Sequence, residues 1–122
     1  MDSHTDVRPR VVRRDDVWVL AGYTCRECGY RLAVAAPWCP VCHGALDDAE
    51  FGPGGTVWGS TILRVPVGGF DPPRGLAYVD LDAGPRLICQ IAEMSELALP
   101  VGSRVALAGP SPEGNPVARA SA

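Results

Sequence analysis

Beyond residue 55 the chain alternates apolar and polar residues with a period of two, which is the pattern of strands that bury one face. The alternation defines four segments, at residues 56–65, 75–82, 86–93 and 103–109. A last short strand is expected through Pro116 to Arg119. A sandwich usually needs about seven strands, so four or five strands favour a small closed barrel of the OB type.

Gly and Pro set the connections between these strands. The stretch "LDAGPRL" (81–87) has the residues of a tight hairpin turn. The stretch "VPVGGFDPPRG" (65–75) predicts a longer loop between the first two strands. A long first loop fits the OB barrel as well as the strand count does.

The first half of the chain lacks this regular alternation. Residues 1–16 have no clear period and are expected to form a flexible arm. The apolar stretch "VWVLAG" (17–22) follows, and the pattern leaves open whether Asp15 and Asp16 cap a helical turn or a strand begins there. Residues 45–55, "ALDDAEFGPGG", combine acids with Gly and Pro and predict a connector. The expected division is an arm (1–16), a small N-terminal unit (17–50) and a barrel (54–122).

Two Cys-x-x-Cys pairs lie in the small N-terminal unit, Cys25 with Cys28 and Cys39 with Cys42. Four thiolates at this spacing match tetrahedral Zn²⁺, because each pair offers two sulfurs about 2.3 Å from one metal and the intervening loop lets the pairs face each other. A unit of about 30 residues cannot bury enough core to fold alone, and zinc binding supplies on the order of 10 kcal/mol. We therefore expect a mainly β protein with a rubredoxin-like zinc ribbon, holding one structural zinc ion per chain, followed by a small OB-fold barrel.

Other kinds of chemistry use such pairs, but their further requirements are not met. A redox dithiol needs a helix N-terminus in a βαβ setting, and a catalytic zinc keeps an open position that four thiolates close. The fifth cysteine, Cys89, shares an alternate face with Leu87 and Ile91 and is expected to be buried. His4 and His43 have no neighbouring nucleophile or acid with which to form a triad. No catalytic residue is predicted.

Composition narrows the class of protein further. A hydrophobic fraction of 47% and a charged fraction of 20% over 122 residues are typical of a soluble globular protein. No apolar run approaches the roughly 20 residues needed to cross a bilayer, and residues 1–10 lack the apolar core of a signal peptide. We expect a cytoplasmic protein without membrane association, in which reduced thiols bind metal rather than form disulfides.

Charge argues against a nucleic-acid binder. The formal net charge is −3, and residues 1–14 carry four Arg against two acids, which leaves −5 for residues 15–122. Contacts with phosphates need a positive field, which such a body does not supply. A nucleic-acid-binding zinc-ribbon/OB module remains the alternative, because both folds occur in that class.

The cysteine pairs and the motifs of the barrel together resemble the family of zinc-ribbon/OB-fold accessory proteins associated with acyl-CoA metabolism. The likeness covers residues 17 to about 108 and rests on the order of several short motifs. After the cysteine pairs these are a strand with Gly55, Val57 and Thr61, an Arg-x-Pro-x-x-Gly-Phe turn (Arg64, Pro66, Gly69, Phe70), a Val-Asp-Leu-Asp-x-Gly hairpin (79–84) and a late Val-Gly-x-x-Val (Val101, Gly102, Val105).

The resemblance implies a non-catalytic subunit that binds a thiolase-like, hydratase or aldolase enzyme and helps it to handle acyl-CoA thioesters. In such complexes the ribbon docks on the partner and the barrel helps to enclose the acyl-CoA. The chain departs from the family pattern at His43, where the second pair is usually followed by Gly, and at its short C-terminus, which lacks the usual aromatic final strand.

Arg64, Phe70 and Arg74 are the candidate CoA contacts in this family context, since the phosphates of CoA need guanidinium or backbone N–H donors. The other interpretation is that both arginines are ordinary surface residues. Four bulky side chains are open to two interpretations, as core residues or as anchors of a partner interface: Trp18, Trp38, Trp58 and Phe70.

Overall fold

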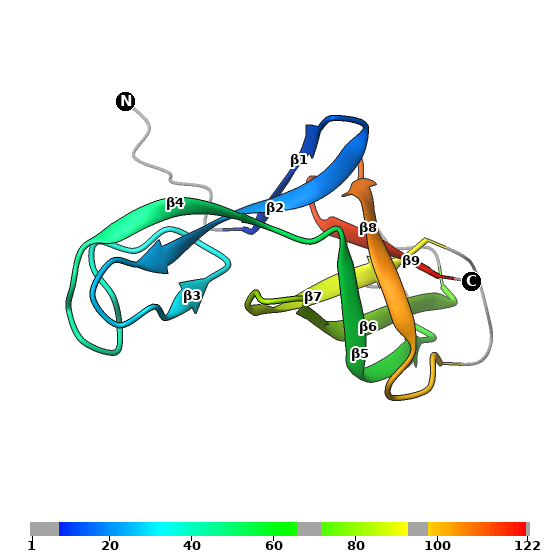
Figure 1. Ribbon diagram of the computed structural model, residues 1–122. Coiled ribbons are helices and arrows are strands. Elements are labelled where there is room, and N and C mark those ends of the chain that lie inside the picture. The colour runs from blue at the N-terminus through cyan, green and yellow to red at the C-terminus, as the bar shows by residue number, and fades with distance from the viewer. Residues whose placement is uncertain (1–7, 66–71, 93–97, 122) are drawn as a thin grey trace, which may run out of the picture.

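The computed structural model describes residues 8–65, 72–92 and 98–121 as two β-structures side by side (Figure 1). A small N-terminal sheet contains β1 (Arg10–Arg14), β2 (Val17–Cys25), β3 (Arg31–Leu32) and β4 (Leu46–Phe51). A closed barrel contains β5 (Gly54–Leu63), β6 (Arg74–Leu81), β7 (Arg86–Ile91), β8 (Arg104–Pro110) and β9 (Pro116–Ala120). Within these ranges no helix is long and apolar enough to cross a membrane.

The barrel has the strand order β5-β6-β7-β9-β8, and β8 returns to pair with β5. The neighbours are antiparallel except for β7 and β9, which run parallel through Gln90 and Ile91. This closed five-stranded arrangement is the OB-fold, so the predicted mainly β class and the barrel are both confirmed. The short C-terminal segment supplies β9, and this strand completes the barrel between β7 and β8 without an aromatic residue.

Alternation in the sequence predicted the barrel strands because each strand buries every second side chain. On β6 the burial alternates from Gly75 to Leu81, and on β8 it alternates from Val105 to Gly109. The inward side chains form one apolar core with contributions from every barrel strand. Cys89 belongs to this core beside Leu87, as expected.

The N-terminal sheet shares that core. Val11 of β1 and Leu20 of β2 belong to the same apolar cluster as the barrel residues. Trp18 packs against the cluster, and its indole lies over Gly109 of β8. A Cβ at residue 109 would come within 3.2 Å of the Trp18 ring, and φ there is +110°, so this close approach requires glycine. Trp18 is therefore partly buried and packs against the core.

Residues 10–14 form β1, which differs from the expectation of a flexible arm over residues 1–16; residues 1–7 lie outside the described residues. The strand pairs with β2 through a two-residue turn at Asp15 and Asp16, whose φ angles are +50° and +70°. Two consecutive positive φ values are typical of a type I′ turn, which Asp tolerates. The question of a helical turn at residues 17–22 is thereby settled in favour of a strand.

Residues 46–51 form β4, so the prediction of a connector over residues 45–55 was wrong. The strand pairs with β2 from Leu20 to Cys25. Its sequence lacks the alternation of apolar and polar residues that identified the barrel strands. Its acids are accommodated because they pair with arginines: Glu50 pairs with Arg14 at 2.7 Å, and Asp47 pairs with Arg26 at 2.6 Å. The connection to the barrel is short, and β5 begins at Gly54.

Candidate metal centre and partner surface

The two Cys-x-x-Cys pairs form two turns with the same backbone hydrogen bonds. In the first, the N–H of Cys25 donates to the carbonyl of Tyr30 at 2.8 Å and the N–H of Gly29 donates to the carbonyl of Cys25 at 3.0 Å. In the second, the N–H of Cys39 donates to Gly44 and the N–H of His43 donates to Cys39, both at 2.9 Å. We call these two turns, residues 25–30 and 39–44, the knuckles.

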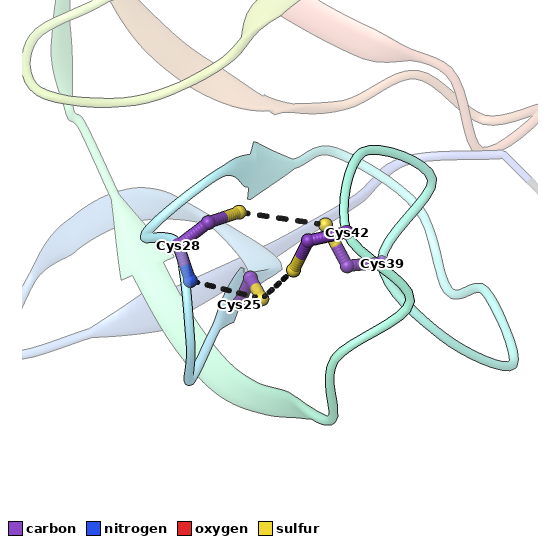
Figure 2. Close-up of side chains that lie close together, drawn as sticks. All are labelled: Cys25, Cys28, Cys39 and Cys42. Carbon is purple, nitrogen blue, oxygen red and sulfur yellow. Dashed lines mark hydrogen bonds between the residues drawn. The ribbon is translucent and has the colours of Figure 1, made fainter.

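The knuckles bring the four sulfurs together, as Figure 2 shows. All four lie within 4.8 Å of one another, with 3.4 Å between Cys25 and Cys42 and 3.7 Å between Cys28 and Cys39. A tetrahedral zinc site with bonds of about 2.3 Å has sulfurs about 3.8 Å apart. The cluster therefore fits a metal ion held by Cys25, Cys28, Cys39 and Cys42, the four residues that the sequence predicted.

Backbone N–H groups of the knuckles donate to the sulfurs. Cys25 accepts from Glu27 at 3.3 Å and from Cys28 at 3.4 Å, while Cys39 accepts from Val41 at 3.3 Å. The bond from the N–H of Cys28 is the main cause that lowers the pKa of Cys25 to about 6, against desolvation, which raises it. The N–H of Gly44 lowers the pKa of Cys42, but hydrogen bonds with Cys25 and Cys28 raise it to about 12. A divalent cation removes this conflict, because it stabilises every thiolate at once.

Among the described residues, Cys89 and His43 show no arrangement for nucleophilic chemistry. Cys89 is buried in the barrel core, and desolvation raises the pKa of its thiol to about 12. His43 lies on the second knuckle with its ring edge-on to Trp38, at 6.1 Å between centroids. His4 lies outside the described residues.

Three large apolar side chains on or next to the knuckles face solvent. Tyr30 is 47% exposed, Trp38 is 54% exposed and Val41 is 62% exposed. We call these three residues the ribbon tip. Trp38 is thus not a core residue. Large exposed aromatic side chains are frequent anchors of protein interfaces.

A cavity of about 460 Å³ lies between the N-terminal sheet and the β6–β7 turn of the barrel. Residues 30–34 form one wall and Gly84, Pro85 and Arg86 form the other. The guanidinium of Arg86 also lies 4.2 Å from the centroid of the Trp58 ring. Arg86 therefore lies between this cavity and an apolar surface on the outside of the barrel.

This outer surface consists of Trp58, Tyr78 and Ile88, which we call the barrel patch. Trp58 is 54% exposed and meets Tyr78 edge-on at 5.9 Å between centroids. A β-bulge between Val57 and Gly59 leaves Trp58 without a partner on β6. Trp58 is therefore an exposed aromatic residue and not part of the core.

Arg86 beside the barrel patch and Arg104 on β8 are each paired with a carboxylate. Arg86 binds Asp80 at 2.6 Å, and Arg104 binds Asp82 at 2.6 Å and 2.9 Å. These pairs lower the pKa of Asp80 and of Asp82, chiefly through the side-chain hydrogen bonds from Arg86 and Arg104. Among the described residues, the arginine that contacts the barrel patch is therefore neutralised by Asp80.

The three candidate CoA contacts do not all fall within the described residues. Arg64 is exposed and follows β5 directly, and Arg74 begins β6 opposite Leu63, so the two arginines flank the first loop of the barrel. Phe70 lies outside the described residues. The sequence did not single out Gln90, a buried polar residue near the end of β7, although a glutamine within the apolar run 87–92 was a visible signal.

By architecture this is a four-cysteine ribbon joined to an OB barrel. Residues 48–109 match the family described as ChsH2, C-terminal OB-fold domain, and because this match covers half of the chain, the chain belongs to that family. The chain is also similar to a solved structure titled Ltp2-ChsH2(DUF35) aldolase, with 25% identity, a TM-score of 0.67 and coverage of 84% of this chain and 85% of that chain. None of the curated proteins matches. The resemblance drawn from the motifs is thereby confirmed at the level of the family.

Proposed function

We propose that this chain is a non-catalytic subunit that binds a cytoplasmic enzyme of acyl-CoA chemistry and helps it to handle thioesters. The partner is of the thiolase-like, hydratase or aldolase type, and the likeness to the Ltp2-ChsH2(DUF35) aldolase favours an aldolase among these. One Zn²⁺ on Cys25, Cys28, Cys39 and Cys42 has a structural role, since four thiolates leave no open position for catalysis.

The observation that carries this proposal is the ribbon tip. Tyr30, Trp38 and Val41 are exposed on or next to the knuckles, whose backbone hydrogen bonds hold these loops in place before a partner arrives. Aromatic anchors of this kind contribute most of the binding energy in protein interfaces. A fixed conformation also lowers the entropy lost on binding.

Charge separates this function from the nucleic-acid alternative. The barrel patch has the stacking aromatics that a single-strand binder needs, namely Trp58 and Tyr78. The adjacent Arg86 is paired with Asp80, however, so its charge is not left for a phosphate backbone. Phosphate neutralisation supplies most of non-specific nucleic-acid affinity, and this surface lacks the means for it.

Arg64 and Arg74 are the proposed CoA contacts, together with Phe70. Both arginines flank the first loop of the OB barrel, where such barrels often receive ligands. Loss of one charge-assisted contact to a phosphate costs about 1.5 to 3 kcal/mol, so Arg64→Ala or Arg74→Ala should raise the KM of the complex for acyl-CoA by roughly tenfold to a hundredfold. Steady-state kinetics of the purified complex measure this change.

Co-expression with acyl-CoA enzymes from neighbouring reading frames, followed by affinity capture and assay, tests the function itself. We expect one enzyme to co-purify and to need this chain for full activity. Trp38→Ala and Val41→Ser should weaken capture, whereas Val17→Ser should not, because Val17 is an exposed apolar residue at the β1–β2 turn and lies outside the ribbon tip. Turnover of a thioester by this chain alone, or full activity of the partner without it, contradicts the proposal.

A further inference from the structure

A second cavity, of about 420 Å³, lies at the other end of β6 and β7. Arg74 and Gln90 line it, together with Ala108, Val117 and the β8–β9 turn at Ser111 and Glu113. This end of the barrel is distinct from the barrel patch, which lies along Trp58, Tyr78 and Ile88. The cavity contains neither metal ligands nor ribbon-tip residues.

Gln90 is the polar residue of this cavity whose burial needs an explanation. Its neighbours Cys89 and Ile91 are core residues, and Gln90 itself is only 6% exposed. Its Nε2 is shut off from water and has no hydrogen-bond partner among the described residues. Buried donors in folded proteins are nearly always paired, so an unpaired one calls for a missing acceptor.

Arg74 presents a second donor of the same kind. Its Nε is also shut off from water, and it too has no partner in the described part of the chain. The register explains why the two side chains line one cavity. Gln90 lies opposite Leu76 on the β6–β7 ladder, and Arg74 precedes Leu76 by two residues, so the two are diagonal neighbours on one face.

The other polar groups at this cavity leave the Nε of Arg74 without a hydrogen-bond partner among the described residues. The hydroxyl oxygen of Ser111 accepts from the N–H of Asn115 at 3.1 Å, which leaves its hydrogen for a further acceptor. Glu113 is exposed, and its backbone carbonyl accepts a hydrogen bond from Arg8. The cavity thus combines the guanidinium of Arg74 and the amide donor of Gln90 with an apolar wall at Ala108 and Val117, and the exposed Glu113 lies at its edge.

We propose that this cavity binds an oxyanion, either a phosphate or a carboxylate, with Arg74 and Gln90 as its two donors. A guanidinium and a neighbouring amide match the two acceptor oxygens that both anions offer. The anion site belongs to the isolated chain. In the context of the proposed function it adds Gln90 to Arg74 as a contact for the anionic part of the CoA ligand, but its existence does not depend on a partner enzyme.

The test measures the melting temperature and the binding isotherm of the full chain with its metal bound. Sodium phosphate and sodium acetate are compared with sodium chloride at matched ionic strength. An anion that binds the folded chain raises the melting temperature in proportion to ligand occupancy. We expect phosphate or acetate to do so, and we expect Arg74→Gln and Gln90→Leu each to weaken that anion roughly tenfold or more.

Arg119→Gln is the matched control, because Arg119 is an exposed arginine of β9 that does not line the cavity. Gln90→Leu keeps the side-chain volume and removes an unpaired donor, so it should fold even if Arg74→Gln does not. The proposal is overturned if neither anion acts beyond chloride, or if both variants respond as the wild type does. CoA and dephospho-CoA are then tested as competitors of the bound anion. Competition by CoA but not by dephospho-CoA indicates that the 3′-phosphate of CoA is the natural occupant, and no competition by either indicates a free anion. A chain that binds phosphate but captures no enzyme would keep the anion site and lose the proposed function.

Discussion

Gly29 and His43 occupy equivalent positions in the two knuckles. Each donates its N–H to the carbonyl of the first cysteine of its knuckle, and each has a positive φ, +78° for Gly29 and +65° for His43. Glycine adopts this conformation without strain, whereas a side chain costs about 1 kcal/mol or more. The second knuckle therefore carries a strain that the first does not.

Introducing a side chain at residue 29 and removing the one at residue 43 should change the stability of the ribbon in opposite directions. Nothing lies within 4 Å of a Cβ at residue 29, so Gly29→Ala should cause no steric clash. It should lower the free energy of unfolding only by the cost of a side chain at positive φ, about 1 kcal/mol. His43→Gly should stabilise by less than that, because it also removes the edge contact with Trp38. Zinc competition with a chelator and denaturant unfolding measure both changes. An unchanged Gly29→Ala variant would contradict the interpretation.

Local rules account for the elements that the sequence predicted. The barrel strands bury one face each, so period two is visible, and the knuckles need Cys at fixed spacing. Strand β4 was missed because its acidic residues are stabilised by arginines distant in sequence, such as Arg14 with Glu50. Strand β1 was missed because Val11 is its one buried side chain. Both strands depend on pairing with β2, and the sequence within each strand does not reveal that pairing.

The candidate site likewise has a part that the sequence predicts and a part that it does not. The four metal ligands could be predicted, because their spacing alone specifies the geometry of the cluster. The exposure of Trp38 and Trp58 and the packing of Trp18 against the core could not, since all three are bulky aromatic residues. Their positions depend on a β-bulge, a knuckle and a glycine on another strand.

Metal removal should change the number of reactive thiols in a defined way. The chain has five cysteines, of which four form the cluster and Cys89 is buried with a raised pKa. With zinc bound we expect no rapid reaction with a thiol reagent, four reactive thiols after chelation, and the fifth only in denaturant.

Cys25→Ser and Cys39→Ser should lose zinc and solubility together, because the metal supplies much of the folding free energy of the ribbon. Cys89→Ala is the control, since it should retain one zinc per chain in elemental analysis. Full stability of either ligand variant without metal would exclude a structural role for the cluster.

Acid should weaken the folded state through the carboxylates paired with arginine. Hydrogen bonds from Arg86 and Arg104 lower the pKa of Asp80 and Asp82 in the folded chain. A folded pKa below the unfolded value adds stability above about pH 4, and that stability is lost as the pH falls through the folded pKa. Arg104→Gln should therefore be less stable than the wild type at pH 7, and the difference should shrink below about pH 4. The contribution is small because both partners are about half exposed. Denaturant unfolding of the two proteins at several pH values measures it, and a difference that grows in acid would contradict the assignment.

Polynucleotides should bind weakly or not at all at physiological salt, despite the exposed aromatics of the barrel patch. Stacking on Trp58 and Tyr78 contributes only where a positive groove first holds the backbone, and Arg86 and Arg104 are paired with aspartates. Asp80→Asn and Asp82→Asn together would release both arginines, so this double variant should bind single-stranded DNA more tightly than the wild type and with a steeper salt dependence. Trp58→Ala added to it should remove most of that gain if stacking is involved. Fluorescence anisotropy with a labelled oligonucleotide at several salt concentrations measures each step. Sub-micromolar binding by the wild-type chain that falls steeply with salt would favour the nucleic-acid class over the accessory subunit.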